Sequence, residues 1–116
     1  MILTSLEVMS NYFTYITTNP RRTTLYTGMT NDLEQRIVEH YLLRGKPMTF
    51  AGQCYCYMLL YYERHQRPVH AIEREKGIKA MSRKQKEELI ETDNPKWNFL
   101  NSMIMRWPPH PDHTSR

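Results

Sequence analysis

Hydrophobic and polar positions along the chain follow a strand-like pattern in three stretches and a helical period in three others. β-Branched and aromatic residues fill 12–18 and 23–28, and the turn-forming sequence NPRR separates the two stretches, which predicts a β-hairpin. The stretch 53–63, QCYCYMLLYYE, is rich in the same residue types and predicts a third strand.

The first predicted helix follows the hairpin directly. Thr30 or Asn31 is placed to cap its N-terminus, acidic residues suit its first turn, and it should end near Arg44, before a glycine and a proline. Its apolar stripe consists of Leu33, Ile37 and Tyr41. One face of this helix should therefore pack against the sheet.

Two further helices are predicted after the third strand. The first spans residues 69–80, and Ser82 with Gln85 gives a capping-box signal for the second, which should run to about Thr92. The element order is then β-β-α-β-α-α. This order predicts an α+β fold in which helices flank a small three-stranded antiparallel sheet.

A chain of 116 residues has room for one domain with one core. We expect that domain at 11–100, after an N-terminal extension at 1–10 and before a proline-rich, disordered tail at 101–116. No apolar run approaches the about 20 residues that cross a bilayer, and the first residues lack the basic segment of a secretion signal. A cytoplasmic location, with no membrane association, is the expectation.

The charge balance favours a polyanionic partner. Sixteen Lys and Arg against twelve Asp and Glu give a net charge of +4 and a pI near 9.2. Basic residues in loops and near helix ends could follow a phosphate backbone, although a run such as SRKQKEE is also typical of a solvated helix face. The candidate nucleic-acid-binding residues are Arg21, Arg22, Arg44, Lys46, Lys79, Arg83 and Lys84.

The two cysteines lie two positions apart in the third predicted strand. Cys54 and Cys56 should face the same way, and a disulfide over so short a loop would be strained, so free thiols are expected. A zinc site that recruits His65 and His70 is an alternative.

Arg36 and His40 lie one turn apart on the flank of the first helix's apolar stripe. Taken alone, they are ordinary edge residues whose stems cover apolar surface, and Tyr15 and Tyr26 are ordinary cross-strand aromatics. Together with a metal-binding carboxylate they can hydrolyse a phosphodiester. The metal stabilises charge, the arginine pairs with a phosphate oxygen, and a hydroxyl or imidazole takes the proton of the attacking water.

Glu75 is the candidate for that carboxylate. On a helical wheel it projects from an apolar arc formed by Ala71, Ile72 and Ile78, whereas Glu73 points to solvent. A carboxylate in that position is costly unless it is paired, for example with Lys79, or bound to a metal.

The stretch FTYITTNPRRTTLYTGMTNDLEQRIVEH, followed by AIEREKGIK, resembles the GIY-YIG nuclease superfamily over about residues 11–98. The resemblance is strongest to small stand-alone members that are similar to the N-terminal nuclease domain of the UvrC excision-repair subunit. In this family two tyrosine motifs on neighbouring strands precede a helix with Arg and His and a later helix with a metal-binding Glu. These positions match Tyr15, Tyr26, Arg36, His40 and Glu75.

Two further positions follow from the resemblance. Gly28 takes the place of the glycine that ends the second motif, which reads YTG here, while the first motif reads FTY. The asparagine that many members carry near the end of the domain matches Asn94, or alternatively Asn98. Gly77 lies two residues after the metal-binding position and would loosen that helix by about 1 kcal/mol relative to alanine.

The resemblance implies a DNA endonuclease that depends on one Mg²⁺ or Mn²⁺ ion held by Glu75, with no small-molecule cofactor. Tyr15 or His40 would help to deprotonate the attacking water, Tyr26 would orient the water or the phosphate, and Arg36 would stabilise the pentacovalent phosphate. Which group is the base stays open, because a tyrosine needs a strongly lowered pKa to act near neutrality.

Two other functions remain as alternatives. The chain could be a DNA-binding module that keeps the fold without cleavage, or an interaction protein in which these polar residues are structural. A DNA-binding module would bind DNA without nicking it, which distinguishes it from a nuclease. An interaction protein would show no salt-dependent affinity for DNA. The sequence leaves open which DNA structure is preferred, which pathway the protein serves, with DNA repair as one possibility, and its oligomeric state. Specificity could come from loops such as 44–52.

Overall fold

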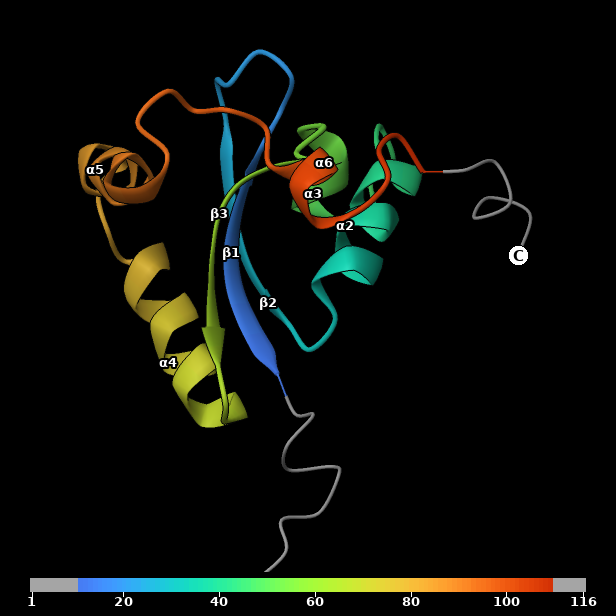
Figure 1. The fold of residues 1–116 in the computed structure, drawn as a ribbon. Coiled ribbons are helices and arrows are strands. Elements are labelled where there is room, and N and C mark those ends of the chain that lie inside the picture. The colour runs from blue at the N-terminus through green and yellow to red at the C-terminus, as the bar shows by residue number, and fades with distance from the viewer. Residues whose placement is uncertain (1–10, 110–116) are drawn as a thin grey trace, which may run out of the picture.

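The computed structural model describes residues 11–109. Its elements are β1 (Tyr12–Thr18), β2 (Leu25–Thr30), α2 (Leu33–Leu42), α3 (Phe50–Gln53), β3 (Met58–His65), α4 (Pro68–Lys79), α5 (Arg83–Asp93) and α6 (Asn101–Ile104). The sheet lies between two helical layers, with α4 and α5 on one face and α2, α3 and α6 on the other (Figure 1). The predicted α+β class and the order β-β-α-β-α-α are confirmed, with the short helices α3 and α6 added.

The three strands form one antiparallel sheet in the order β2-β1-β3. The central strand β1 is buried from Thr14 to Thr18, because both its faces are covered by helices. Successive side chains alternate between these faces. Tyr15 therefore faces α2, while its neighbours Thr14 and Ile16 face α4 and α5.

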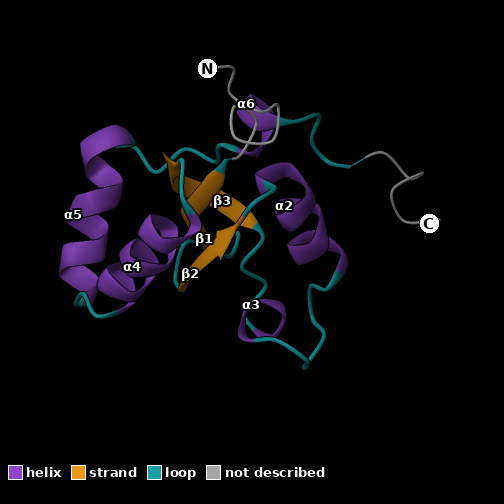
Figure 2. Ribbon diagram, turned by 90° about the horizontal axis from the view of Figure 1, so that it is seen from below, coloured by secondary structure: helices purple, strands orange, loops and turns teal. Residues whose placement is uncertain are grey.

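Two hydrophobic clusters hold the layers together, one on each face of the sheet. The cluster beneath α4 and α5 consists of Ile16, Leu60, Tyr61, Ile78 and Ile90. The cluster beneath α2 consists of Tyr15, Leu33, Ile37 and Leu59. Figure 2 shows the sheet edge-on between these two layers. The predicted stripe of α2 is confirmed, with its third member, Tyr41, partly buried.

The hairpin and the start of α2 differ from the prediction by two residues. β2 begins at Leu25 because the Asn19 side chain accepts hydrogen bonds from the backbone N–H of Thr23 and Thr24, which keeps both in the turn. The N-cap of α2 is Asp32, whose side chain accepts from the Gln35 N–H at 3.1 Å. The predicted caps at Thr30 or Asn31 were therefore wrong.

The strand predicted at 53–63 begins later, at Met58. Of the residues before Met58, Gln53 ends α3, whose N-cap is Thr49, and 54–57 form a turn and short loop in which Tyr55 takes a positive φ of 58°. Cys54 and Cys56 are free thiols as predicted, but both lie before the strand. Within residues 11–109, no three His, Cys, Asp or Glu side chains converge to hold a metal, so the zinc alternative gains no support.

The C-terminal segment also differs from the expected tail. Asn101 is 1% exposed, its side chain accepts from the Leu59 N–H at 2.7 Å and donates to the Tyr57 carbonyl at 3.0 Å. Trp107 packs on Tyr41. Residues 101–107 thus belong to the fold, while 1–10 and 110–116 lie outside the described residues. No helix within 11–109 is long and apolar enough to cross a membrane.

Candidate active site

A buried hydrogen bond joins Tyr15 to His40 on the face of the sheet that α2 covers. The Tyr15 hydroxyl oxygen lies 2.7 Å from His40 Nε2. Tyr15 is fully buried and His40 is 8% exposed. Because Leu33 and Ile37 anchor α2 to the sheet, His40 on the next turn is directed at the tyrosine. His40, predicted on the flank of the helix, therefore contacts Tyr15, predicted on the strand.

Gly28 allows the Tyr15 ring to lie across β2. The two residues are opposite each other in the hairpin register. A Cβ atom at position 28 would lie only 2.6 Å from Tyr15 Cζ, closer than real side chains approach. The glycine of the second motif is therefore required by the position of the tyrosine of the first motif. Because β2 is the edge strand, Tyr15 points toward the edge of the sheet.

Tyr26 completes an aromatic triangle with Tyr15 and His40. Its ring centroid lies 6.3 Å from that of Tyr15 and 5.3 Å from that of His40, and the latter two are 5.7 Å apart. Tyr26 is partly exposed, whereas the other two rings are buried. It is thus the member of the triangle that a substrate can reach most directly.

Arg36 places a positive charge beside the Tyr15–His40 pair. Burial lowers the pKa of His40 to about 4, and the Arg36 charge acts in the same direction, so the imidazole is neutral at pH 7. Burial also raises the pKa of Tyr15, with a further rise from Tyr26 and an opposing effect of Arg36, so its hydroxyl is protonated. In this pair the Tyr15 hydroxyl carries a proton, and the neutral His40 ring has a nitrogen that can accept one.

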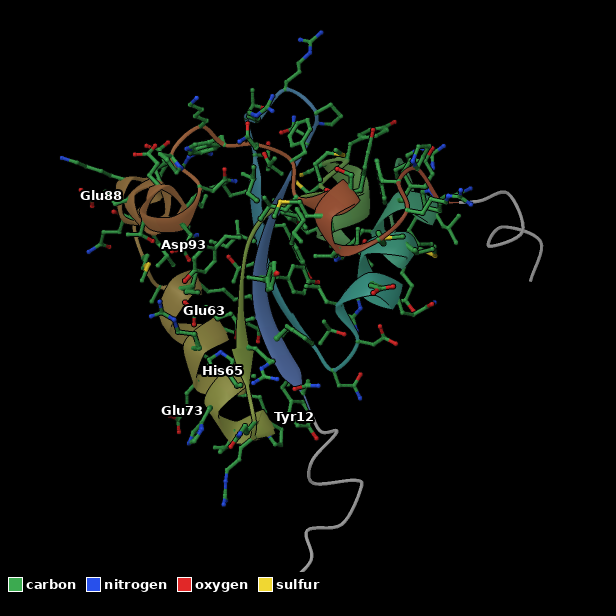
Figure 3. The ribbon with its side chains drawn as sticks, in the orientation of Figure 1. Tyr12, Glu63, His65, Glu73, Glu88 and Asp93 are labelled. Carbon is green, nitrogen blue, oxygen red and sulfur yellow. The ribbon has the colours of Figure 1, made fainter. Side chains whose placement is uncertain are left out.

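Glu75 lies on α4, in the other helical layer, and its charge acts on Tyr15. α4 contacts both β1 and β2, and the negative charge of Glu75 contributes to the raised pKa of Tyr15. The Glu75 side chain is 22% exposed, and its carboxylate lies 3.3 Å from Lys79 Nζ. The sequence analysis named this ion pair with Lys79 as the structural alternative to metal binding. Glu73 is exposed and lies on the outer side of α4 (Figure 3).

The predicted apolar arc of α4 is only partly correct. Ala71 and Ile78 are fully buried, but Ile72 is 40% exposed. Glu75 is still partly buried, because it lies four residues after Ala71 and three before Ile78 and shares their face. The helical wheel therefore placed the carboxylate correctly although one member of its arc faces solvent.

The basic residues predicted to bind nucleic acid lie in two places. At the hairpin turn, Arg22 Nε donates to the Trp97 carbonyl at 2.9 Å. Arg83 donates to the Thr23 carbonyl at 3.0 Å and pairs with Glu87 at 2.9 Å. Arg22 and Arg83 thus hold the turn against α5 and the segment after it. Arg21 and Lys84 are exposed beside them.

The other three predicted basic residues lie at the end of α4 and in the loop after α2. Lys79 pairs with Glu75. Arg44 and Lys46 belong to the loop after α2 that leads to Phe50, and Phe50 stacks on Tyr26 with ring centroids 6.4 Å apart. Phe50 was missed by the sequence analysis. The available signal was an aromatic residue within a loop that also carries two cations.

Asn94 belongs to the scaffold. It ends α5, donates to the Leu60 carbonyl at 3.0 Å and to the Asn98 carbonyl at 2.8 Å, and accepts from the Asn98 N–H at 2.9 Å. These bonds use the whole amide and tie the end of α5 to β3. The structure thus brings Tyr15, Tyr26, Arg36 and His40 together, with Glu75 near enough for its charge to act on Tyr15, and it places Asn94 at the end of α5. The catalytic roles of these five stay predictions.

Comparison with known proteins gives a family match and a similar fold. The sequence profile described as "GIY-YIG catalytic domain" matches residues 11–88. The solution NMR structure of a UPF0213 protein from Bacillus halodurans has a similar fold, with a TM-score of 0.50 and 24% identity over 83% of this chain and 97% of that one. A search of curated proteins found no match.

Proposed function

The chain belongs to the GIY-YIG family, and from that premise we propose that it is a divalent-metal-dependent DNA endonuclease that hydrolyses phosphodiester bonds by water attack at a single-metal site. The observation that supports this best is the convergence of four side chains from two strands and a helix. Tyr15 and His40 share a hydrogen bond, with Tyr26 and Arg36 beside them. These groups supply the proton acceptor and the cation that phosphoryl chemistry requires.

Glu75 fits the role of ligand for Mg²⁺ or Mn²⁺. Mg²⁺ is commonly held by one or two carboxylates, with waters and substrate phosphates completing its shell. The Glu75 carboxylate is partly buried, and among residues 11–109 its ion-pair partner is Lys79, which is 54% exposed. Such an exposed ion pair is weak, so a divalent cation can compete with Lys79. When bound, the ion would stabilise negative charge on the phosphate and the leaving oxygen.

Tyr15 and His40 act as a pair in the proposed proton transfer. A tyrosinate is not present beforehand, because burial raises the pKa of Tyr15. Its hydroxyl can donate its own proton to neutral His40 while it accepts a proton from the attacking water. Tyr15 and His40 then take successive roles: Tyr15 receives the proton of the water, and His40 is the final acceptor. Because Tyr15 is fully buried, this transfer requires its hydroxyl to become accessible when the substrate binds.

Arg36 and Tyr26 act on the phosphate. The Arg36 guanidinium is partly exposed and lies on the side of α2 that faces the pair. It can donate to a non-bridging oxygen, and this contact strengthens as charge builds in the transition state. Tyr26, the more accessible tyrosine, orients the phosphate or the water. DNA is the proposed partner because the net charge is +4 and the loop after α2 is basic.

The Lys79–Glu75 pair is the one observation that favours the second candidate, a DNA-binding module without cleavage. If the pair persists when DNA binds, Glu75 is structural and no metal enters. The two functions therefore differ in whether the Glu75 carboxylate binds a metal ion or stays paired with Lys79.

The decisive experiment compares Glu75→Gln with Glu73→Gln. Plain, nicked and branched DNAs are incubated with each protein and Mg²⁺ or Mn²⁺, and nicking is followed on gels. We expect the wild type and Glu73→Gln to nick DNA, and Glu75→Gln to bind DNA without nicking it. Metal affinity, measured by calorimetry on the same proteins, should fall only in Glu75→Gln. A folded wild type that binds DNA and never nicks it would establish the second candidate instead.

A further inference from the structure

An exposed aromatic residue lies next to the candidate site. Phe50, the first residue of α3, is 55% exposed and stacks on Tyr26 with an interplanar angle of 24°. Met48, two residues earlier, is 70% exposed. One face of Phe50 is therefore turned to the site, and much of the remaining ring is open to solvent. An aromatic ring in this position loses the hydrophobic stabilisation that burial would give.

The loop holds Phe50 in a fixed position. The Thr49 hydroxyl accepts from the Gly52 N–H at 2.9 Å, and the Gly45 N–H donates to the Gly52 carbonyl at 2.8 Å. A Cβ atom at Gly52 would lie 2.7 Å from the Lys46 carbonyl, so the chain returns on itself with no room for a side chain. The exposure of Phe50 is thus built into the loop and is not the result of a loose segment.

The surface around Phe50 is positively charged. Residues 41–57 contain Arg44 and Lys46 and no Asp or Glu. The Arg44 guanidinium is held over the Tyr41 ring at 3.8 Å and donates to the Tyr41 carbonyl at 2.6 Å. Positive charge beside an exposed aromatic ring on a fixed loop is the combination that binds single-stranded nucleic acid, since cations contact phosphates and the ring stacks on a base.

We propose that Phe50 is a stacking platform for an unpaired base of the DNA substrate, so that the protein prefers DNA with an unpaired nucleotide beside the bond that is cut. This inference rests on the proposed nuclease function and names its substrate class. In an intact duplex, neighbouring bases cover both faces of each base. An unpaired nucleotide can turn a face to Phe50 while its phosphate lies near Tyr26 and its neighbours contact Arg44 and Lys46.

The test measures binding separately from cleavage. Three labelled DNAs of one sequence are compared in EDTA by fluorescence anisotropy: an intact duplex, the same duplex with a one-nucleotide flap, and the single strand. We expect the wild type to bind the flap and the single strand roughly tenfold or more tightly than the duplex, and Phe50→Ala to lose that preference. Phe50→Trp should retain it.

Met103→Ala is the matched control. Met103 is 77% exposed and lies in α6, which is remote from α3 in the second view (Figure 2). This variant should keep the wild-type preference. A 2-aminopurine base at the flap position reports stacking directly. Its fluorescence should change on binding to the wild type and Phe50→Trp, and much less on binding to Phe50→Ala.

The outcomes separate this inference from the proposed function. If the wild type nicks DNA and Phe50→Ala keeps the full preference for the flap, the stacking platform is wrong and the nuclease stands. If the wild type never nicks DNA yet shows Phe50-dependent flap binding, the nuclease is wrong and the binding surface stands. Equal binding of duplex and flap by the wild type, or tighter binding of the same sequence as RNA, would overturn the inference.

Discussion

Two polar networks built from the same kinds of residue lie on opposite faces of β1. The site network, on the α2 side, consists of Tyr15, Tyr26, Arg36 and His40. The bracing network, on the α4 side, consists of Thr14, Tyr61, Glu63, His65 and Arg74. Figure 3 shows two members of the bracing network, Glu63 and His65, on β3 beside α4. Each network has tyrosine, arginine and histidine, yet only one is a candidate for chemistry.

The difference lies in where each arginine finds a carboxylate. Arg74 donates to both oxygens of Glu63 at 2.8 to 3.0 Å, and the Tyr61 hydroxyl donates to the same group. Burial alone would raise the pKa of Glu63, but these hydrogen bonds lower it. The bracing network therefore neutralises its own cation and ties β3 to α4, the helix that carries Glu75.

In the site network the arginine's partner is on the surface. Arg36 pairs with Glu39 of its own helix at 3.1 Å, and that carboxylate is 47% exposed. An exposed pair of this kind is weak, so the Arg36 charge can be redirected to a phosphate. The same residue types are therefore structural where a partly buried carboxylate completes the network, and they are candidates for catalysis where the arginine's carboxylate partner lies on the surface.

The largest expected contrast is between the two arginines. Arg36→Ala should lower kcat for DNA nicking by about 10²- to 10³-fold, because it removes a donor to the transition state, with little effect on the free energy of unfolding. Arg74→Ala should lower the free energy of unfolding by about 1–2 kcal/mol, since both partners are partly solvent-exposed, while kcat changes less than tenfold. Urea denaturation and single-turnover kinetics measure the two effects. Equal loss of kcat in both folded variants would contradict the division.

The next contrast is between two glycines. Gly28→Ala places a methyl group against the buried Tyr15 ring, which should destabilise the fold by about 1–3 kcal/mol and reduce nicking, because the Tyr15–His40 bond is disturbed. Gly77→Ala meets no atom within 4 Å and should stabilise α4 by up to about 1 kcal/mol. Thermal and urea unfolding, with nicking assays, compare both with the wild type. If Gly28→Ala kept full activity, the Tyr15 position would not matter for chemistry.

The last contrast is a pH dependence of stability that comes from His40 of the site network. The pKa of His40 falls from 6.5 to about 4 on folding, so the unfolded chain binds more protons between these values. Stability is therefore fully present above pH 6.5 and is lost as the pH falls toward 4, by up to about 3 kcal/mol. His40→Gln should remove this part of the decline. Carboxylates such as Glu63 titrate in both proteins, and their contribution cancels in the difference.

That difference is read from urea unfolding of the wild type and His40→Gln between pH 7 and pH 4. A parallel pair of curves, with no divergence below pH 6.5, would show that His40 takes up a proton as readily in the folded protein as in the unfolded chain. The lowering of the His40 pKa by burial would then be wrong.

Much of the fold followed from local patterns in the sequence. The strand at 12–18 was predicted with the bounds of β1, and the capping box of Ser82 and Gln85 forms as expected. Both depend on neighbours within a few residues, where side-chain chemistry acts directly on the backbone. The one-turn spacing of Arg36 and His40 is equally local, because the helical period fixes it.

Errors arose where a turn or a distant residue decides the outcome. The residues before Met58 looked like strand, yet 54–57 form the turn and short loop that follow α3. Asn101 looked like the start of a tail, but its side chain bonds to Leu59, 42 positions earlier. Propensity is a weak guide in such places, because tertiary contacts outweigh it.

The sequence by itself determined which residues are candidates for phosphodiester hydrolysis, since motif order and helical spacing are properties of the chain. Only the tertiary structure decided how they are used. It brings Tyr15 within 2.7 Å of His40, requires a glycine at position 28, and lowers the pKa of His40 through burial. It also separates Arg36 from Arg74, which no local pattern distinguishes, because the partner of each arginine depends on which face of the sheet its helix covers.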